Sequence, residues 1–173
     1  YSTVSGVALN VVLGIPPLAL TIRTKAMKYW KRKGNNIRTL EIAEELIQSE
    51  EEMETWKLRK WQDAWDKDGR ARRTYCFIPN IEQRMKLKHL DPSKGLVHFL
   101  SGHGPYNTTL WRLQLKDTEN CECGVRATPE HVVLECKDTE GFRDVKEARQ
   151  KLDNKVTKEI IENEDLTIIL NKL

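Results

Sequence analysis

Three cysteines and one histidine lie within sixteen positions and follow the pattern C-x-C-x7-H-x4-C: Cys121, Cys123, His131 and Cys136. Structural zinc sites use these donors, four thiolate or imidazole ligands arranged in a tetrahedron. The spacing from His131 to Cys136 fits a helical turn, and Gly124 permits a tight turn after the second cysteine. The pattern therefore predicts one structural Zn²⁺ ion. The alternative is three unpaired buried thiols and a surface histidine.

The same residues argue against catalysis by the metal. Catalytic zinc keeps one position open for water, whereas four good donors close the shell here. A deaminase would combine a Glu beside its histidine with C-x-x-C; Glu130 precedes His131, but the chain has no C-x-x-C. The sequence also lacks a phosphate-binding glycine loop, a hydrolase nucleophile elbow and an Asp-Asp pair. We expect no catalytic site and no small-molecule substrate in this chain.

Cysteine usage and hydropathy indicate the compartment. The clustered cysteines, with only Cys76 apart from them, are unlike a disulfide framework and favour a reducing, intracellular environment. No apolar run approaches the roughly 18 residues of a membrane span, so we expect no membrane partner. The chain starts at Tyr1 without a Met, and we expect it to be one part of a longer polypeptide.

Charge is unevenly distributed over the 173 residues, whose net charge is +3. Residues 1–114 hold 19 basic and 12 acidic side chains, whereas residues 115–173 hold 10 and 14. A basic part beside a metal site predicts a polyanionic partner such as RNA or DNA.

Two segments are candidates for phosphate contacts. The first is a basic segment between residues 23 and 38 that has no acid and includes Lys28, Lys31, Arg32 and Lys33. Its alternative is a solvated helical hairpin with the acidic helix that follows, from Glu41 to Glu54. The second is an arginine-rich loop after Gly69, with Arg70, Arg72 and Arg73. Arginine can bind phosphate oxygens with two parallel hydrogen bonds.

Three tryptophans, Trp56, Trp61 and Trp65, lie within ten positions. Core packing is the ordinary interpretation, and base stacking is the alternative. His103 lies in a glycine-flanked turn, Ser-Gly-His-Gly; we count it among the nucleic-acid candidates, with capping of a neighbouring helix or loop as the alternative.

Periodicity and turn residues predict a mostly α-helical chain, a bundle-like linker with a small C-terminal CCHC zinc knuckle. Helices are expected at 3–13, 18–33, 41–68, 81–88 and 106–115, with a short extended piece at 74–79 and a proline corner at Pro16-Pro17. In the second helix the apolar positions are Leu18, Ile22, Ala26 and Tyr29 or Trp30. The predicted divisions are 1–55, a helical segment; 56–115, a Trp/Arg-rich linker; 116–140, the knuckle; and 141–173, C-terminal helices.

Three stretches, taken in order, resemble the C-terminal region of non-LTR (LINE-type) retrotransposon reverse transcriptases. They are residues 7–18; Trp61-Gln62-x-x-Trp65 with Gly69-Arg70 and Phe77-Ile78-Pro79; and Phe99-Leu100-Ser101-Gly102-His103-Gly104, followed by the C-x-C-G knuckle, Glu130-His131-x4-Cys136 and Arg143. The similarity covers roughly residues 3–145.

The resemblance implies a segment that follows the polymerase thumb and grips template RNA or target DNA during target-primed reverse transcription. It implies the rest of the parent polymerase as a partner, a nuclear location, and Cys121, Cys123, His131 and Cys136 as the zinc ligands. The competing hypothesis is a zinc-stabilised helical protein-interaction module, including one domesticated from a retroelement.

Overall fold

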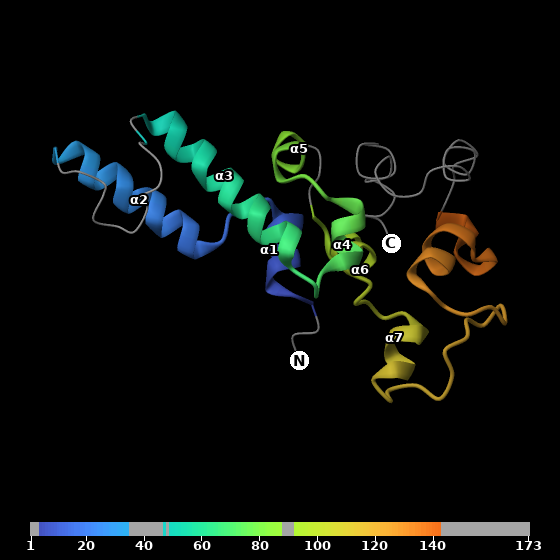
Figure 1. Ribbon diagram of the computed structural model, residues 1–173. Helices are drawn as coiled ribbons and strands as arrows, with labels where there is room; N and C mark the ends of the chain where they lie inside the picture. Colours follow the sequence, from blue (N-terminus) through green and yellow to red (C-terminus); the bar gives the residue numbers. More distant parts are fainter. Residues whose placement is uncertain (1–3, 35–46, 48, 88–91, 143–173) are drawn as a thin grey trace.

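The computed structural model describes residues 4–34, 47, 49–87 and 92–142. Within these ranges the chain is helical, with no β-strand beyond one isolated bridge between Asn120 and Arg126. The helices are α1 (Gly6–Leu13), α2 (Leu18–Arg32), α3 (Glu50–Lys67), α4 (Arg72–Phe77), α5 (Ile81–Lys86), α6 (Lys94–Ser101) and α7 (Asn107–Arg112) (Figure 1). A π-helical turn, η2 (His131–Glu135), and a 3₁₀ helix, η3 (Lys137–Phe142), follow. The mostly helical fold class is thus confirmed.

Local signals set the ends of the first helices. Gly14 ends α1 with a φ of +66°; its N–H and that of Ile15 bond back to the carbonyls of Val11 and Asn10, which is a Schellman motif. Pro16-Pro17 then turns the chain into α2, as expected. In the part of the chain that the structure describes, no single helix is long and apolar enough to span a bilayer; α1 and α2 meet that test only together, with a 61° bend between them.

Helices α2 and α3 form an antiparallel hairpin (Figure 1). A capping box joins Ser49 and Glu52 at the start of α3, so this helix begins at Glu50, and the expected start at Glu41 lies outside the described residues. Met27 of α2 packs with Met53 and Trp56 of α3 in a small apolar cluster.

The expected apolar face of α2 is wrong in its register. The helix buries Thr24 and Met27, while Leu18 and Ile22 are 72% and 57% exposed. The reason is tertiary: α3 packs on the other side of the helix, where Met53 and Trp56 supply the apolar partners of Met27.

The main core joins α1 with α3, α4, α5 and α6. Its largest buried members are Trp61, Trp65, Phe99, Ile81, Leu96 and Leu100, with Val11 and Val12 from α1. All three tryptophans of α3 are at most 5% exposed, so core packing is confirmed for them and base stacking on them is excluded.

Two parts of the second stretch that carries the family resemblance contact each other directly. The Trp65 indole N–H donates to the Ile78 carbonyl at 2.7 Å. Gln62 donates to the Pro79 carbonyl at 2.9 Å and accepts from the Ile81 N–H at 2.8 Å. The pairing of Trp-Gln-x-x-Trp with Phe-Ile-Pro therefore fixes where α5 starts relative to α3.

The extended piece expected at 74–79 is wrong, because residues 72–77 form α4. The Asp68 carboxylate accepts from the N–H groups of Arg70 and Ala71, and this turn starts the helix. Phe77 then packs against Phe99 of α6, with ring centroids 5.5 Å apart and the ring planes tilted by 54°. Helix α6 itself was not predicted from the sequence. The C-terminal helices predicted at 141–173 lie outside the described residues beyond the end of η3.

Candidate metal centre and cationic surface

The first two predicted ligands lie on a hairpin-like loop. The Cys121 N–H donates to the Val125 carbonyl at 2.7 Å, and the Gly124 N–H donates to the Cys121 carbonyl at 2.9 Å. Gly124 has a φ of +88°, a conformation that glycine adopts without steric cost, so the chain can reverse immediately after Cys123. The loop therefore brings both thiols to the same side.

The other two ligands come from η2. The Cys136 N–H donates to the His131 carbonyl at 2.7 Å, an i to i+5 bond of the π-helical type. This wider turn carries Cys136 back over His131, as the four-residue spacing requires. The Thr128 hydroxyl accepts from the His131 N–H at 3.1 Å and anchors the start of the turn.

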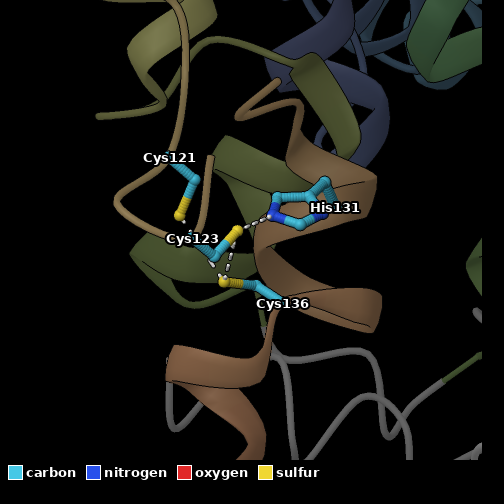
Figure 2. A group of neighbouring side chains, drawn as sticks. All are labelled: Cys121, Cys123, His131 and Cys136. Carbon is cyan, nitrogen blue, oxygen red and sulfur yellow. Dashed lines mark hydrogen bonds between the residues drawn. The ribbon is translucent and has the colours of Figure 1, made fainter. Parts of the chain in front are cut away.

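The four donor atoms face one another, all within 4.8 Å (Figure 2). Cys121 and Cys136 Sγ are 3.5 Å apart, Cys136 and Cys123 Sγ 3.8 Å, and Cys123 Sγ and His131 Nε2 3.1 Å. Around a tetrahedral zinc ion two thiolates would lie about 3.8 Å apart, and a thiolate and an imidazole nitrogen about 3.5 Å. The predicted set therefore converges with spacings that suit Zn²⁺.

Two carboxylates, those of Glu135 and Asp138, lie next to the four predicted ligands, and neither was identified from the sequence. Glu135 Oε2 lies 3.6 Å from Nδ1 of His131, on the ring edge that faces away from the thiols. Carboxylates commonly hold the second ring nitrogen of a metal-bound histidine. Asp138 Oδ2 lies 3.8 Å and 4.0 Å from the Sγ atoms of Cys136 and Cys121. The only sequence signal for either residue is its position within four residues of a ligand.

Arg73 joins the segment that carries the four predicted ligands, residues 121–136 and called the metal loop below, to the helical body. Its guanidinium donates to the Phe99 carbonyl through Nε and Nη2, at 3.1 and 3.0 Å, and Nη1 lies 2.6 Å from Glu130, next to His131. Val133 of η2 belongs to the main core. The Thr108 hydroxyl of α7 donates to the Ala127 carbonyl at 2.9 Å. The metal loop is thus held against the helices at three points.

The Ser-Gly-His-Gly turn owes its residue types to this packing. Gly102 ends α6 with a φ of +70°, and a Cβ added there would lie 2.7 Å from Cδ of Arg73. A Cβ on Gly104 would lie 2.6 Å from the Tyr106 ring. Nδ1 of His103 lies 2.8 Å from the Ser101 carbonyl, so the imidazole caps the end of α6, as the structural alternative for this histidine expected.

The basic segment of α2 is partly committed to α3. Lys28 Nζ lies 3.0 Å from Glu54 and 3.4 Å from Glu50, and its hydrogen bond with Glu54 raises the pKa of Lys28. These pairs support the hairpin alternative for Lys28. Lys31, Arg32 and Lys33 are exposed at the end of the same helix.

The loop expected at the arginine triplet is instead a turn leading into α4, so Arg72 and Arg73 are helical. Arg72 lies over the Tyr75 ring, 3.8 Å from its centroid. Arg70 pairs with Asp68 at 2.8 Å and remains 77% exposed. Two arginines of the triplet nevertheless share a feature with His103: Arg70, Arg73 and His103 line one surface hollow of about 300 Å³. Ser5 and Ser101 line it too, and they were not predicted.

The chain is similar to polyproteins of insect retrotransposable elements. It is 29% identical over 153 residues to a retrovirus-related Pol polyprotein from type-1 retrotransposable element R1 2 of Nasonia vitripennis, which covers 84% of the chain and 37% of the relative. The corresponding protein of element R1 4 from the same wasp is 29% identical, covering 83% of the chain and 38% of the relative.

A third relative is the putative 115 kDa protein in type-1 retrotransposable element R1DM of Drosophila melanogaster. It is 34% identical over 134 residues, covering 70% of the chain and 13% of the relative. The chain thus spans well under half the length of each of these three relatives. No protein-family profile and no solved structure matches the chain.

Proposed function

Because the chain is homologous to the Pol polyproteins of R1 type-1, non-LTR retrotransposable elements, we propose that it is a nucleic-acid-binding region of such a reverse transcriptase. In this proposal it grips template RNA, target DNA or both during target-primed reverse transcription, beside the rest of the polymerase. The free thiols of the metal cluster suit reducing conditions, and target-primed reverse transcription would act on chromosomal DNA, so we propose that the chain acts in the nucleus.

The observation that carries the proposal is the cationic hollow lined by Arg70, Arg73 and His103. These side chains come from two segments about 30 residues apart, and packing of α4 beside the end of α6 brings them together. The Arg70 side chain is 77% exposed, whereas that of its partner Asp68 is 8% exposed and also accepts from the N–H groups of Arg70 and Ala71, so Asp68 keeps hydrogen-bond partners when the Arg70 guanidinium turns to a phosphate. Since Nδ1 of His103 faces a carbonyl, Nε2 is the ring atom left to meet a ligand.

The metal has a structural part in the proposal. Cys121, Cys123, His131 and Cys136 would hold Zn²⁺, whose four bonds stand in for the apolar core that a short loop cannot build. The ordered turn would then keep Glu130 against Arg73. The Arg73 side chain, held by the Phe99 carbonyl and by Glu130, would form a fixed wall of the hollow beside the exposed guanidinium of Arg70.

A salt titration tests the proposal. Binding of the zinc-loaded chain to a fluorescein-labelled RNA hairpin and to a DNA duplex is followed by anisotropy between about 50 and 200 mM salt. Each phosphate neutralised should contribute about −0.7 to −0.9 to the slope of log K against log salt.

Variants locate the binding surface. Arg70→Gln should weaken binding and make the slope shallower by about one phosphate. Lys86→Gln removes an equally exposed, ion-paired charge from α5, outside the hollow, and should change neither quantity. A slope near zero for the unmodified chain would rule out the proposal and favour the protein-interaction module. If Arg70→Gln changes affinity and salt slope no more than Lys86→Gln does, the hollow is not the binding surface.

A further inference from the structure

A second surface hollow, of about 260 Å³, lies between α7 and the metal loop. Its lining includes Arg73, Trp111, Arg112 and Arg126, with Thr108 and Thr109 in its wall. Figure 1 shows α7 beside the segment that leads into the loop. No candidate residue from the sequence except Arg73 belongs to this hollow.

The walls of the hollow are fixed by hydrogen bonds. Thr108 donates to the Ala127 carbonyl at 2.9 Å and so ties α7 to the metal loop. Thr109 donates to the Gly102 carbonyl at 3.1 Å and ties the same helix to the Ser-Gly-His-Gly turn. The hollow is therefore formed before any ligand arrives, and the ordering cost of binding is small.

Trp111 gives the hollow an aromatic surface that is open to solvent. Its side chain is 50% exposed, whereas the three tryptophans of α3 are at most 5% exposed. An exposed indole beside cationic side chains suits a nucleobase, since every base presents a π face for stacking. A base in a duplex is already stacked on both sides, so only an unpaired nucleotide can use this surface.

The charges at the hollow suit the phosphate of the same nucleotide. Arg112 is exposed and has no ion-pair partner among the described residues. Arg126 Nε lies 2.8 Å from Glu119, but the side chain is 63% exposed and its guanidinium has further donors. Arg73 is already paired with Glu130 and serves as part of the wall.

We propose that this hollow binds a nucleotide of single-stranded nucleic acid, with its base on Trp111 and a neighbouring phosphate on Arg112 and Arg126. The proposal rests on the proposed function and deepens it, because it assigns the contact with an unpaired strand to a particular surface. The phosphate hollow of Arg70 and His103 would then contact the strand or duplex elsewhere along its backbone.

The test compares a labelled single-stranded RNA of mixed sequence with a blunt duplex of that sequence. Trp111→Leu should weaken single-strand binding by about 5- to 150-fold, the range for loss of one stacking side chain, with duplex binding unchanged. Trp111→Phe keeps a ring and should restore most of the affinity. Leu115→Ala, which shortens a neighbouring side chain that is 69% exposed, is the matched control and should have no effect.

Arg112→Gln gives an independent readout, since this exposed side chain has no described role in the fold. It should make the single-strand salt slope shallower by about 0.7, while Lys60→Gln, on the exposed face of α3, should leave the slope unchanged.

The possible failures are distinguishable. If the unmodified chain shows no salt-dependent binding to any nucleic acid, the proposed function fails. If it binds but Trp111→Leu behaves like Leu115→Ala, or weakens single strand and duplex equally, only the assignment of this hollow is overturned. An unchanged slope for Arg112→Gln overturns the phosphate contact in the same way.

Discussion

Gly102→Ala probes the contact between the Ser-Gly-His-Gly turn and Arg73. The substitution places a non-glycine residue at a φ of +70°, which costs about 1–2 kcal/mol. The new Cβ would also lie 2.7 Å from Cδ of Arg73, in the middle of a side chain whose head is held by Phe99 and Glu130. To make room, Arg73 must give up part of this binding, and hydrogen bonds of charged groups are worth about 1.5–3 kcal/mol each.

The chain offers a matched control in Gly14. It ends α1 in the same left-handed conformation, with a φ of +66°, but a Cβ there would meet its nearest neighbours at an ordinary 3.5 Å. Gly14→Ala should therefore lose only the backbone cost, about 1–2 kcal/mol, whereas Gly102→Ala should lose about 2.5–5 kcal/mol, the sum of the backbone cost and one hydrogen bond of Arg73. Urea unfolding of both zinc-loaded variants, followed by circular dichroism, measures the difference.

A double-mutant cycle tests the cause. In an Arg73→Ala background the crowding is gone, so Gly102→Ala should cost no more than Gly14→Ala does in the unmodified chain. Equal losses for the two glycine variants in the unmodified chain would refute the reasoning. So would an unchanged cost of Gly102→Ala after Arg73 is removed.

Three further predictions concern the metal and the core. Chelation of zinc, or Cys136→Ser, should unfold residues 119–142 but leave the circular dichroism of α1–α6 largely intact; a variant that keeps both metal and fold would refute the ligand assignment. Trp65→Phe should destabilise the fold by about 1–2 kcal/mol more than Trp61→Phe, because it leaves the Ile78 carbonyl without its hydrogen-bond donor, whereas the Trp61 indole N–H has no described partner. Urea unfolding of the two variants measures the difference, and equal losses of stability would contradict this prediction. Burial raises the pKa of Tyr106 from 10 to about 12, so the contribution of the neutral phenol to the free energy of unfolding is fully present below pH 10 and is lost as the pH rises through 12. Relative to Tyr106→Phe, the unmodified chain should lose up to about 3 kcal/mol of unfolding free energy over that window. Urea unfolding at several pH values measures this loss, and parallel curves for the two proteins would contradict it.

The metal cluster could be predicted in full from the sequence because it is local. All four donors fall within sixteen positions, and a glycine turn and one helical turn suffice to bring them together. The helix ends at Gly14 and the proline corner are local in the same sense, since they depend on residues adjacent in the chain. The burial of Trp61 and Trp65 followed from residue type alone.

Tertiary structure decided what depends on distant neighbours. The sequence places Arg73 beside Arg70 and Arg72, yet only the packing of α4 against α6 gives it the Phe99 carbonyl, and only the position of Glu130 before η2 gives it a carboxylate. Helix α4 itself formed where an extended piece was expected, because burying Phe77 against Phe99 outweighs a weak local preference. The register of α2 was likewise set by Met53 and Trp56 of α3.

The two surface hollows are the features that the sequence alone could least predict. A motif names residue types, but a surface that can hold a ligand requires side chains from separate segments to be brought together and their walls to be fixed. Residue type and spacing predicted the four side chains of this protein that converge and could hold a metal ion. Only the fold, through contacts between residues tens of positions apart, decided which of its arginines bond to the rest of the structure and which are exposed at a surface hollow.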